Sequence, residues 1–170
     1  LERLALGMTA QIREGYIRRE IGAMGPLAEL KGLDTRRLIL ATDMASPEMM
    51  LKTGIMNELV RSAVRVGFEP LKAIQMVTLN PADYFGFRDL GRLAPGALAD
   101  IVLADNIDDL NVQLVMVGGR VVAENGRLTE CIPNFLYPPE LYSTFRLEKI
   151  TSADLALRAP SGPVRVRAVD

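Results

Sequence analysis

The 170-residue chain carries 20 Lys and Arg against 21 Asp and Glu, and its net charge of −1 offers no electrostatic attraction for nucleic acid or an anionic membrane. Although 49% of the residues are hydrophobic, no apolar run approaches the ~20 residues that a membrane span needs. A single cysteine, Cys131, excludes an internal disulfide and a cysteine zinc cluster, and the absence of histidine means that histidine chemistry must come from residues outside this sequence.

The N-terminal part of the chain predicts a strand, a helical stretch and a second strand. A short strand over residues 9–12 ends in the polar turn 13–15, and apolar residues then recur at roughly helical spacing over 17–31. Gly25-Pro26 interrupts this spacing, and Pro26 can open a new helix at its first turn. The apolar run 37–41 lacks alternation, which is typical of a strand buried on both faces of a parallel sheet. Asp43 follows directly, so the pattern places a carboxylate at the exit of the second strand.

The middle of the chain predicts helices first and β structure after them. Two amphipathic helices cover residues 55–66 and about 69–78, and their apolar positions are typical of a protein core. The run 99–104 predicts a strand. A Gly-Gly pair between the apolar runs 114–117 and 120–123 predicts a hairpin.

The two ends of the sequence carry signals of their own. From Cys131 the chain is typical of a loop, until the alternating run 164–169 predicts a half-buried strand. Leu1 begins the sequence without an initiator Met or a signal-peptide pattern, so we expect a piece of a longer chain. One cysteine and no export signal together favour a cytoplasmic protein.

Asp43 is the first candidate for chemistry. In a (β/α)₈ barrel, residues at the C-terminal ends of the strands face the reaction site. An aspartate there can bind a divalent metal and accept a proton from water. The alternative is a turn or helix N-cap residue, because Ser46-Pro47-Glu48 also predicts a helix start.

Glu14 and Arg13 are the second candidates, at the end of the earlier strand. The glutamate can hydrogen-bond a ring nitrogen of a substrate, and Arg13 can pair with Glu14 or orient it. The alternative is a surface turn that carries a salt bridge.

Three segments resemble the amidohydrolase superfamily in their order and spacing. In residues 90–102, two glycines and a proline shape a turn into a strand, and this segment resembles the return of such a chain from its barrel into a small β-sandwich. Residues 73–86 resemble the last barrel helix of the family, and 115–122 resemble its sandwich hairpin.

A narrower resemblance is to the adenine deaminase family. Residues 6–15, followed later by Thr42 and Asp43, are similar to its seventh and eighth barrel strands. The other similar segments lie in the last barrel helix and in the linker to an additional C-terminal domain: 73–76, 79–82, 137–145 and 151–155.

The resemblance implies an α/β fold made of the last two β/α units of a (β/α)₈ TIM-type barrel, strands of the small amidohydrolase β-sandwich and the start of a C-terminal domain. The implied bounds are 1–86 for the barrel end, 87–130 for the composite β-sandwich strands, and 131–170 for the linker and the start of the C-terminal adenine deaminase domain. Two strands cannot close a barrel, so the other strands must lie outside this sequence. We therefore expect the isolated chain to be inactive.

For function, the resemblance implies a hydrolase of purine metabolism that acts on C–N bonds and converts adenine and water into hypoxanthine and ammonia. It also implies a divalent metal (Mn, Fe or Zn), bound mainly by residues outside this sequence, that activates the water. By the same resemblance, Asp43 binds the metal, takes a proton from the water and passes it to the leaving amino group. Glu14 and Arg13 would bind the purine.

Two positions depart from the adenine deaminase pattern. Met44 stands where a second acidic residue often follows the strand-8 aspartate, and residues 54–58 lack a histidine that many members carry. We expect both departures to affect substrate choice and rate. Two alternatives stay open: another cyclic amidohydrolase of the dihydroorotase, hydantoinase or deacetylase type, and a truncated module without catalysis.

The expected partners follow from this assignment. They are a small-molecule purine, the remainder of the protein's own polypeptide and further copies of the protein in a homo-oligomer. We expect no nucleic acid and no membrane among the partners.

Overall fold

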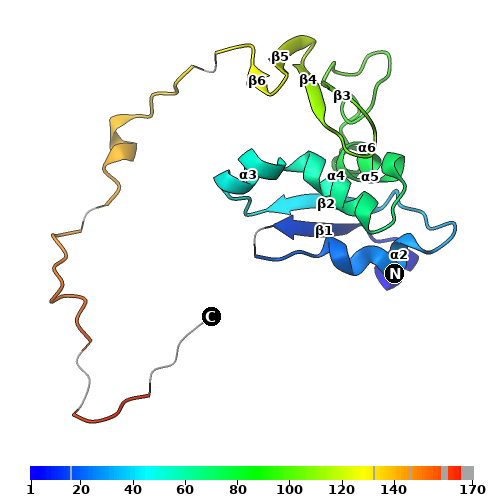
Figure 1. Cartoon of the computed structure of the whole chain (residues 1–170). Coiled ribbons are helices and arrows are strands. Elements are labelled where there is room, and N and C mark those ends of the chain that lie inside the picture. Colours follow the sequence, from blue (N-terminus) through cyan, green and yellow to red (C-terminus); the bar gives the residue numbers. More distant parts are fainter. Residues whose placement is uncertain (16, 132, 146, 158–160, 166–170) are drawn as a thin grey trace. The chain divides into compact units, whose positions relative to one another are not determined.

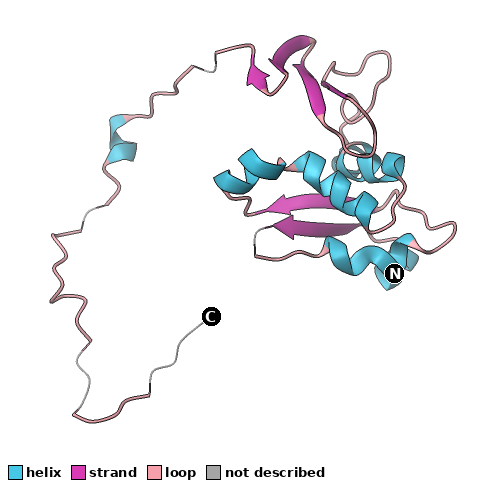
Figure 2. Cartoon of the chain, in the orientation of Figure 1, coloured by secondary structure: helices cyan, strands magenta, loops and turns pink. Residues whose placement is uncertain are grey.

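The computed structural model describes residues 1–15, 17–131, 133–145, 147–157 and 161–165 (Figure 1). The chain divides into two units, Leu1–Cys131 and Ile132–Asp170. All strands of the described residues belong to the first unit (Figure 2).

The first unit begins with a mixed α/β region and ends with a small antiparallel sheet. The elements of its α/β region are α1 (Glu2–Ala5), β1 (Ala10–Gly15), the 3₁₀ turn η1 (Ile21–Met24), α2 (Gly25–Ala28), β2 (Leu38–Asp43), α3 (Pro47–Thr53), α4 (Met56–Arg65), α5 (Pro70–Val77) and α6 (Leu79–Phe85). The antiparallel sheet contains β3 (Ile101–Ala104), β4 (Val112–Val117), β5 (Arg120–Glu124) and β6 (Arg127–Leu128).

Strands β1 and β2 run parallel and side by side (Figure 1). Their register pairs Ala10 with Leu38 and Gly15 with Asp43, so both strands end at the same edge. The chain between them includes η1 and α2, and the helices α4 and α5 contact β2. The arrangement is a strand–helix–strand unit, the connection that parallel strands require.

One hydrophobic cluster forms the core of the α/β region. Leu38 and Leu40 of β2 are buried in it together with Ile21 of η1, Leu59 of α4 and Met76 of α5. Side chains two positions apart on a strand share a face. The face of β2 that carries the two leucines is therefore the face covered by the helices.

Asn80 ties α6 to the start of β2. Its side chain is only 4% exposed, and Nδ2 donates to the carbonyl oxygens of Thr35 and Leu38, both at 2.8 Å. A buried carbonyl without a donor costs about 1–3 kcal/mol. Asn80 therefore fixes the first residues of the strand that ends in Asp43.

The antiparallel sheet follows sequence order, β3-β4-β5-β6. Gly118 and Gly119 connect β4 to β5 with φ values of 55° and 81°, and Asn125 and Gly126 connect β5 to β6 with φ values of 49° and 75°. Two-residue turns with positive φ at both positions match the twist of paired antiparallel strands. Between 83 and 131, no described residue is buried.

The second unit contains one short 3₁₀ turn, η2 (Pro139–Tyr142). Every residue that the structure describes in this unit is exposed. Across the described parts of the whole chain, no helix combines the length and the apolar character needed to cross a membrane.

Most of the predicted elements are confirmed, and the structure differs from the prediction at three places. Residues 13–15 form no turn, because their pairing with the end of β2 continues the strand to Gly15. Over 17–31 the structure has two short pieces, η1 and α2, and α2 begins at Gly25-Pro26, where the sequence predicted a break and a new helix start. The strand predicted over 164–169 does not include Val164 or Arg165, and its remainder lies outside the described residues.

Candidate active site

Arg13 and Asp43 meet at the end of the parallel strand pair. Arg13 lies on β1 opposite Ala41, and Asp43 is the last residue of β2. Nη1 of Arg13 donates to Oδ2 of Asp43 at 2.9 Å. Since Asp43 is four positions from Ile39 and three from Leu40, its side chain belongs to the face away from the leucines of the core.

Glu20 completes a row of three charged groups. Nη2 of Arg13 lies 3.5 Å from Oε1 of Glu20, and the backbone N–H of Arg13 donates to Oε2 of Glu20 at 3.3 Å. The guanidinium of Arg13 is thus shared between two carboxylates, one nitrogen for each. The side chains are partly exposed, by 36% for Arg13, 46% for Glu20 and 40% for Asp43.

The row lines an open hollow of about 450 Å³. Its other walls come from the same two strands, and the full lining is Gln11, Arg13, Glu20, Ala41, Thr42 and Asp43. A hollow with two carboxylates, a guanidinium and an amide can bind a small polar molecule by complementary hydrogen bonds.

Glu14 is placed apart from this row. It follows Arg13 on the strand, so its side chain turns to the opposite face, and Oε2 accepts a hydrogen bond from the backbone N–H of Ile21 at 3.0 Å. Glu14 lines a separate cavity of about 380 Å³ against α3 and α4. The structure therefore brings Arg13 and Asp43 together and places Glu14 elsewhere, without the Arg13–Glu14 pair that the sequence suggested.

The helix-cap alternative for Asp43 does not hold, because Ser46 takes that role. Ser46 is the N-cap of α3, and its Oγ accepts a hydrogen bond from the backbone N–H of Met49 at 3.2 Å. Between Asp43 and this cap, Met44 turns the chain with a φ of 51°. The carboxylate of Asp43 is therefore available to the hollow rather than to the helix.

Gly15 has a role that the sequence pattern did not reveal. It is buried and lies opposite Asp43, and a Cβ at this position would stand 1.7 Å from the backbone oxygen of Asp43. Only glycine permits this approach, because the atom in the way belongs to the backbone. A glycine at the end of a predicted strand is the signal that points to such a contact.

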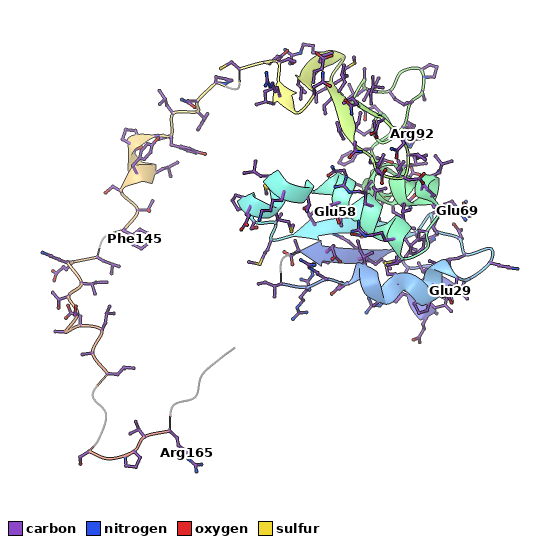
Figure 3. All side chains as sticks on the ribbon, in the orientation of Figure 1. Glu29, Glu58, Glu69, Arg92, Phe145 and Arg165 are labelled. Carbon is purple, nitrogen blue, oxygen red and sulfur yellow. The ribbon has the colours of Figure 1, made fainter. Side chains whose placement is uncertain are left out.

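Glu58, which lies on α4 (Figure 3), lines the second cavity and is paired with two arginines of the same helix. Nε of Arg61 donates to Oε2 of Glu58 at 3.0 Å, and Nη2 of Arg65 donates to Oε1. Burial raises the pKa of Glu58, but the hydrogen bonds from Arg65 and Arg61 together hold that pKa below its usual value. Glu58 is thus a paired structural carboxylate.

The described residues supply only part of a ligand set for a metal ion. Among the described residues, no group of three or more His, Cys, Asp or Glu side chains stands close enough together to hold an ion. Asp43 fits as a single ligand, since Oδ1 has no hydrogen-bond partner in the part of the chain that the structure describes. A carboxylate oxygen suits Mn²⁺, Fe²⁺ and Zn²⁺.

The chain matches known proteins over almost its whole length. It is 38% identical to adenine deaminase 1 of Carboxydothermus hydrogenoformans and 41% identical to the adenine deaminase of Moorella thermoacetica, over 99% and 98% of this chain respectively. The adenine deaminase of Ruegeria pomeroyi is 38% identical over 99% of the chain. The chain spans 28% of the length of each of these relatives.

The family model for amidohydrolases matches residues 8–122, a segment that begins before β1 and ends in β5. This segment contains both parallel strands, the Arg13–Asp43 pair and most of the antiparallel sheet. The chain therefore belongs to the amidohydrolase family.

Proposed function

We propose that this chain forms part of a metal-dependent enzyme that hydrolyses adenine to hypoxanthine and ammonia. The observation that carries the proposal is the carboxylate of Asp43, held by Arg13 at the exit of a parallel strand, in a chain that resembles enzymes named adenine deaminase. Water supplies the oxygen of hypoxanthine, and the amino group leaves as ammonia.

The proposed fold places this site at the mouth of a barrel. In it, β1 and β2 are the last two strands of a (β/α)₈ barrel formed by residues 1–86. Residues 87–130 contribute strands to a small β-sandwich, and 131–170 lead into a C-terminal domain. The parallel register and the helix-covered face of β2 support this arrangement.

Asp43 is the residue of this chain that would hold the metal. A divalent ion, when bound, acts as a Lewis acid that makes water a stronger nucleophile near neutral pH. Because the described residues offer no complete set of ligands, the remaining ligands would come from other parts of the protein.

Asp43 also moves the proton in the proposed reaction. Its carboxylate accepts a proton from the attacking water and delivers it to the amino group of adenine, which leaves as ammonia. Arg13 orients the carboxylate through the 2.9 Å hydrogen bond, and it would bind the purine in the hollow that both residues line. The purine contact of Glu14 stays a prediction, and in the structure Oε2 of Glu14 accepts a hydrogen bond from the N–H of Ile21.

The test is an Asp43→Asn substitution in the natural protein that carries this sequence. Asparagine cannot accept the proton, so kcat for ammonia release from adenine should decrease by about 100-fold to 10,000-fold, while the melting temperature stays close to that of the wild type. Asp34→Asn is the matched control, because Asp34 precedes the opposite end of β2 and pairs with Arg36. Near-normal turnover by the Asp43→Asn protein would refute the proposed role.

The same assay separates the alternatives. Ammonia release from adenine supports the proposal. Turnover of dihydroorotate, hydantoins or acetylated amino sugars, without turnover of adenine, would assign the protein to another branch of the family. A folded natural protein that retains no metal and turns over none of these compounds would favour a module without catalysis.

A further inference from the structure

We infer that Glu20 is a positioning residue, which keeps Arg13 in a one-nitrogen contact with Asp43 and so leaves Oδ1 of Asp43 free to take part in the reaction. This inference rests on the proposed function, because it assigns Glu20 a role in the site that contains Asp43.

The first step of the argument is the way that Arg13 is shared. A guanidinium commonly binds one carboxylate through two nitrogens, since its donors match both oxygens. Here Nη1 serves Asp43 at 2.9 Å, whereas Nη2 is turned toward Glu20 at 3.5 Å. Glu20 thus draws away the nitrogen that would otherwise approach the second oxygen of Asp43.

The second step is the way that Glu20 is itself held in place. Residues 18–20 run back along β1: the N–H of Gly15 donates to the oxygen of Arg18 at 2.8 Å, and the N–H of Glu20 donates to the oxygen of Arg13 at 3.2 Å. The next residue, Ile21, is buried in the core with 1% of its surface exposed.

Glu14 fixes the same segment from the other side of the strand. Its Oε2 accepts the hydrogen bond from the backbone N–H of Ile21, directly after Glu20. The position of Glu20 is therefore set by backbone pairing on one side and by the buried Ile21 on the other. A carboxylate held in this way can orient Arg13, although all three charged side chains are partly exposed.

The third step compares the expected effect of Glu20 on stability with its expected effect on the reaction. Partly exposed ion pairs contribute little to the free energy of unfolding. Arg13, by contrast, hydrogen-bonds the proposed metal ligand Asp43, and removal of such a group commonly changes metal affinity or activity about 10-fold to 100-fold. Glu20 acts on Asp43 through the orientation of Arg13. The effect of Glu20 should therefore be seen in the reaction and in metal binding, and hardly in the melting temperature.

The experiment is a double-mutant cycle in the natural protein, with Glu20→Gln, Arg13→Gln and both changes together. Two quantities are measured: kcat/KM for adenine, and the affinity of the metal-free protein for Mn²⁺ in competition with a chelator. For Glu20→Gln we expect each to decrease by about tenfold, because Arg13 then closes onto both oxygens of Asp43. In the Arg13→Gln background, Glu20→Gln should cause no further loss.

Glu48→Gln is the control, since Glu48 forms a comparable ion pair with Lys52 at 2.6 Å on α3. It should change neither quantity. Glutamine has nearly the shape of glutamate, so the Glu20→Gln protein should keep its melting temperature; if it does not, Glu20→Ala takes its place in the cycle.

Two results would overturn the inference. One is a Glu20→Gln protein with unchanged activity and unchanged Mn²⁺ affinity. The other is an equal loss with and without Arg13, which would show that Glu20 does not act through Arg13. A wild-type protein that binds Mn²⁺ but does not release ammonia from adenine would instead refute the proposed function, and the Mn²⁺ measurement would still test Glu20.

Discussion

The parallel pair β1–β2 and the antiparallel sheet β3–β6 use their side chains in different ways. In β2 the three residues from Leu38 to Leu40 are buried in succession, whereas the described residues of the antiparallel sheet include no buried one. Hairpins form between neighbours in the sequence, but parallel strands need a long connection and a covering layer. The position of Asp43 therefore depends on packing between distant segments, while the hairpins depend on their turns.

The largest expected effect comes from a methionine-to-alanine substitution, which can be made in both regions and so tests the contrast between them. Met76 is 0% exposed in the core, and Met116 is half-buried in β4. Met76→Ala removes buried methylene groups and leaves a cavity, so the free energy of unfolding should decrease by about 3 kcal/mol. Met116→Ala should decrease it by about 1 kcal/mol.

Denaturant unfolding of the natural protein measures both values. Equal losses for the two methionines would mean that the antiparallel sheet is as well packed as the core, and the contrast between the regions would then be wrong.

The next effect concerns the close approach of β1 and β2. Gly15→Ala places a Cβ against the backbone oxygen of Asp43, and the strand must move to relieve the collision. We expect a loss of about 2 kcal/mol in the free energy of unfolding together with a lower kcat for adenine, since Asp43 is displaced.

Gly22→Ala is the matched control for Gly15→Ala. No atom lies within 4 Å of the Cβ that this change adds, so stability and activity should stay close to those of the wild type. A harmless Gly15→Ala substitution would contradict the close approach of the two strands.

A smaller effect compares two residues with positive φ, one in each region. Met44 has a φ of 51° after β2, and Asn125 has a φ of 49° in the β5–β6 turn. Asparagine tolerates this conformation better than methionine, by about 1 kcal/mol. Met44→Asn should therefore raise the midpoint of unfolding and Asn125→Met should lower it, and shifts of the same sign would be inconsistent with these backbone angles.

The smallest expected effect is the contribution of Glu58 to the pH dependence of the free energy of unfolding. Because the pKa of Glu58 is lower in the folded protein than the ordinary value of 4.5, its ionised form stabilises the fold above that value. The contribution is lost as the pH falls through the lowered pKa. Glu58→Gln should thus reduce stability by up to about 1 kcal/mol at pH 7 and by less at pH 3.

The measurement is the free energy of unfolding of the wild type and of the Glu58→Gln protein at each pH, and the difference between the two values is compared across the series. A difference that grows as the pH falls would mean that the pKa of Glu58 is raised rather than lowered in the folded protein.

The sequence was sufficient to predict those helices and strands that are specified by a few neighbouring residues. Gly118-Gly119 between apolar runs predicted the hairpin, and the unbroken apolar run from Leu38 predicted a buried strand. The stretch over 17–31 was predicted in part: Gly25-Pro26 marked the place where α2 begins, but the spacing of the apolar residues did not show that η1 and α2 are only four residues long each.

The candidate site was only partly predictable for a related reason. Arg13, Glu14 and Asp43 were proposed as site residues from their places at strand ends. The sequence did not show which of these three side chains lie on the same face of the sheet, because that depends on how far each strand extends. Since β1 continues past the predicted turn, Glu14 faces the helices. Glu20 was missed because its contact with Arg13 depends on a chain reversal without a distinctive local pattern.

The alternation of side chains along β2 limits which changes in chain length the protein can accept. Insertion of one residue between Leu40 and Asp43 would rotate the aspartate to the side covered by helices and bring a neighbour to the hollow in its place. Insertions in the exposed connection around Lys31 and Gly32 leave the strand itself intact. Natural variation in length should therefore collect in that connection, and the four residues that precede Met44 should keep a constant spacing.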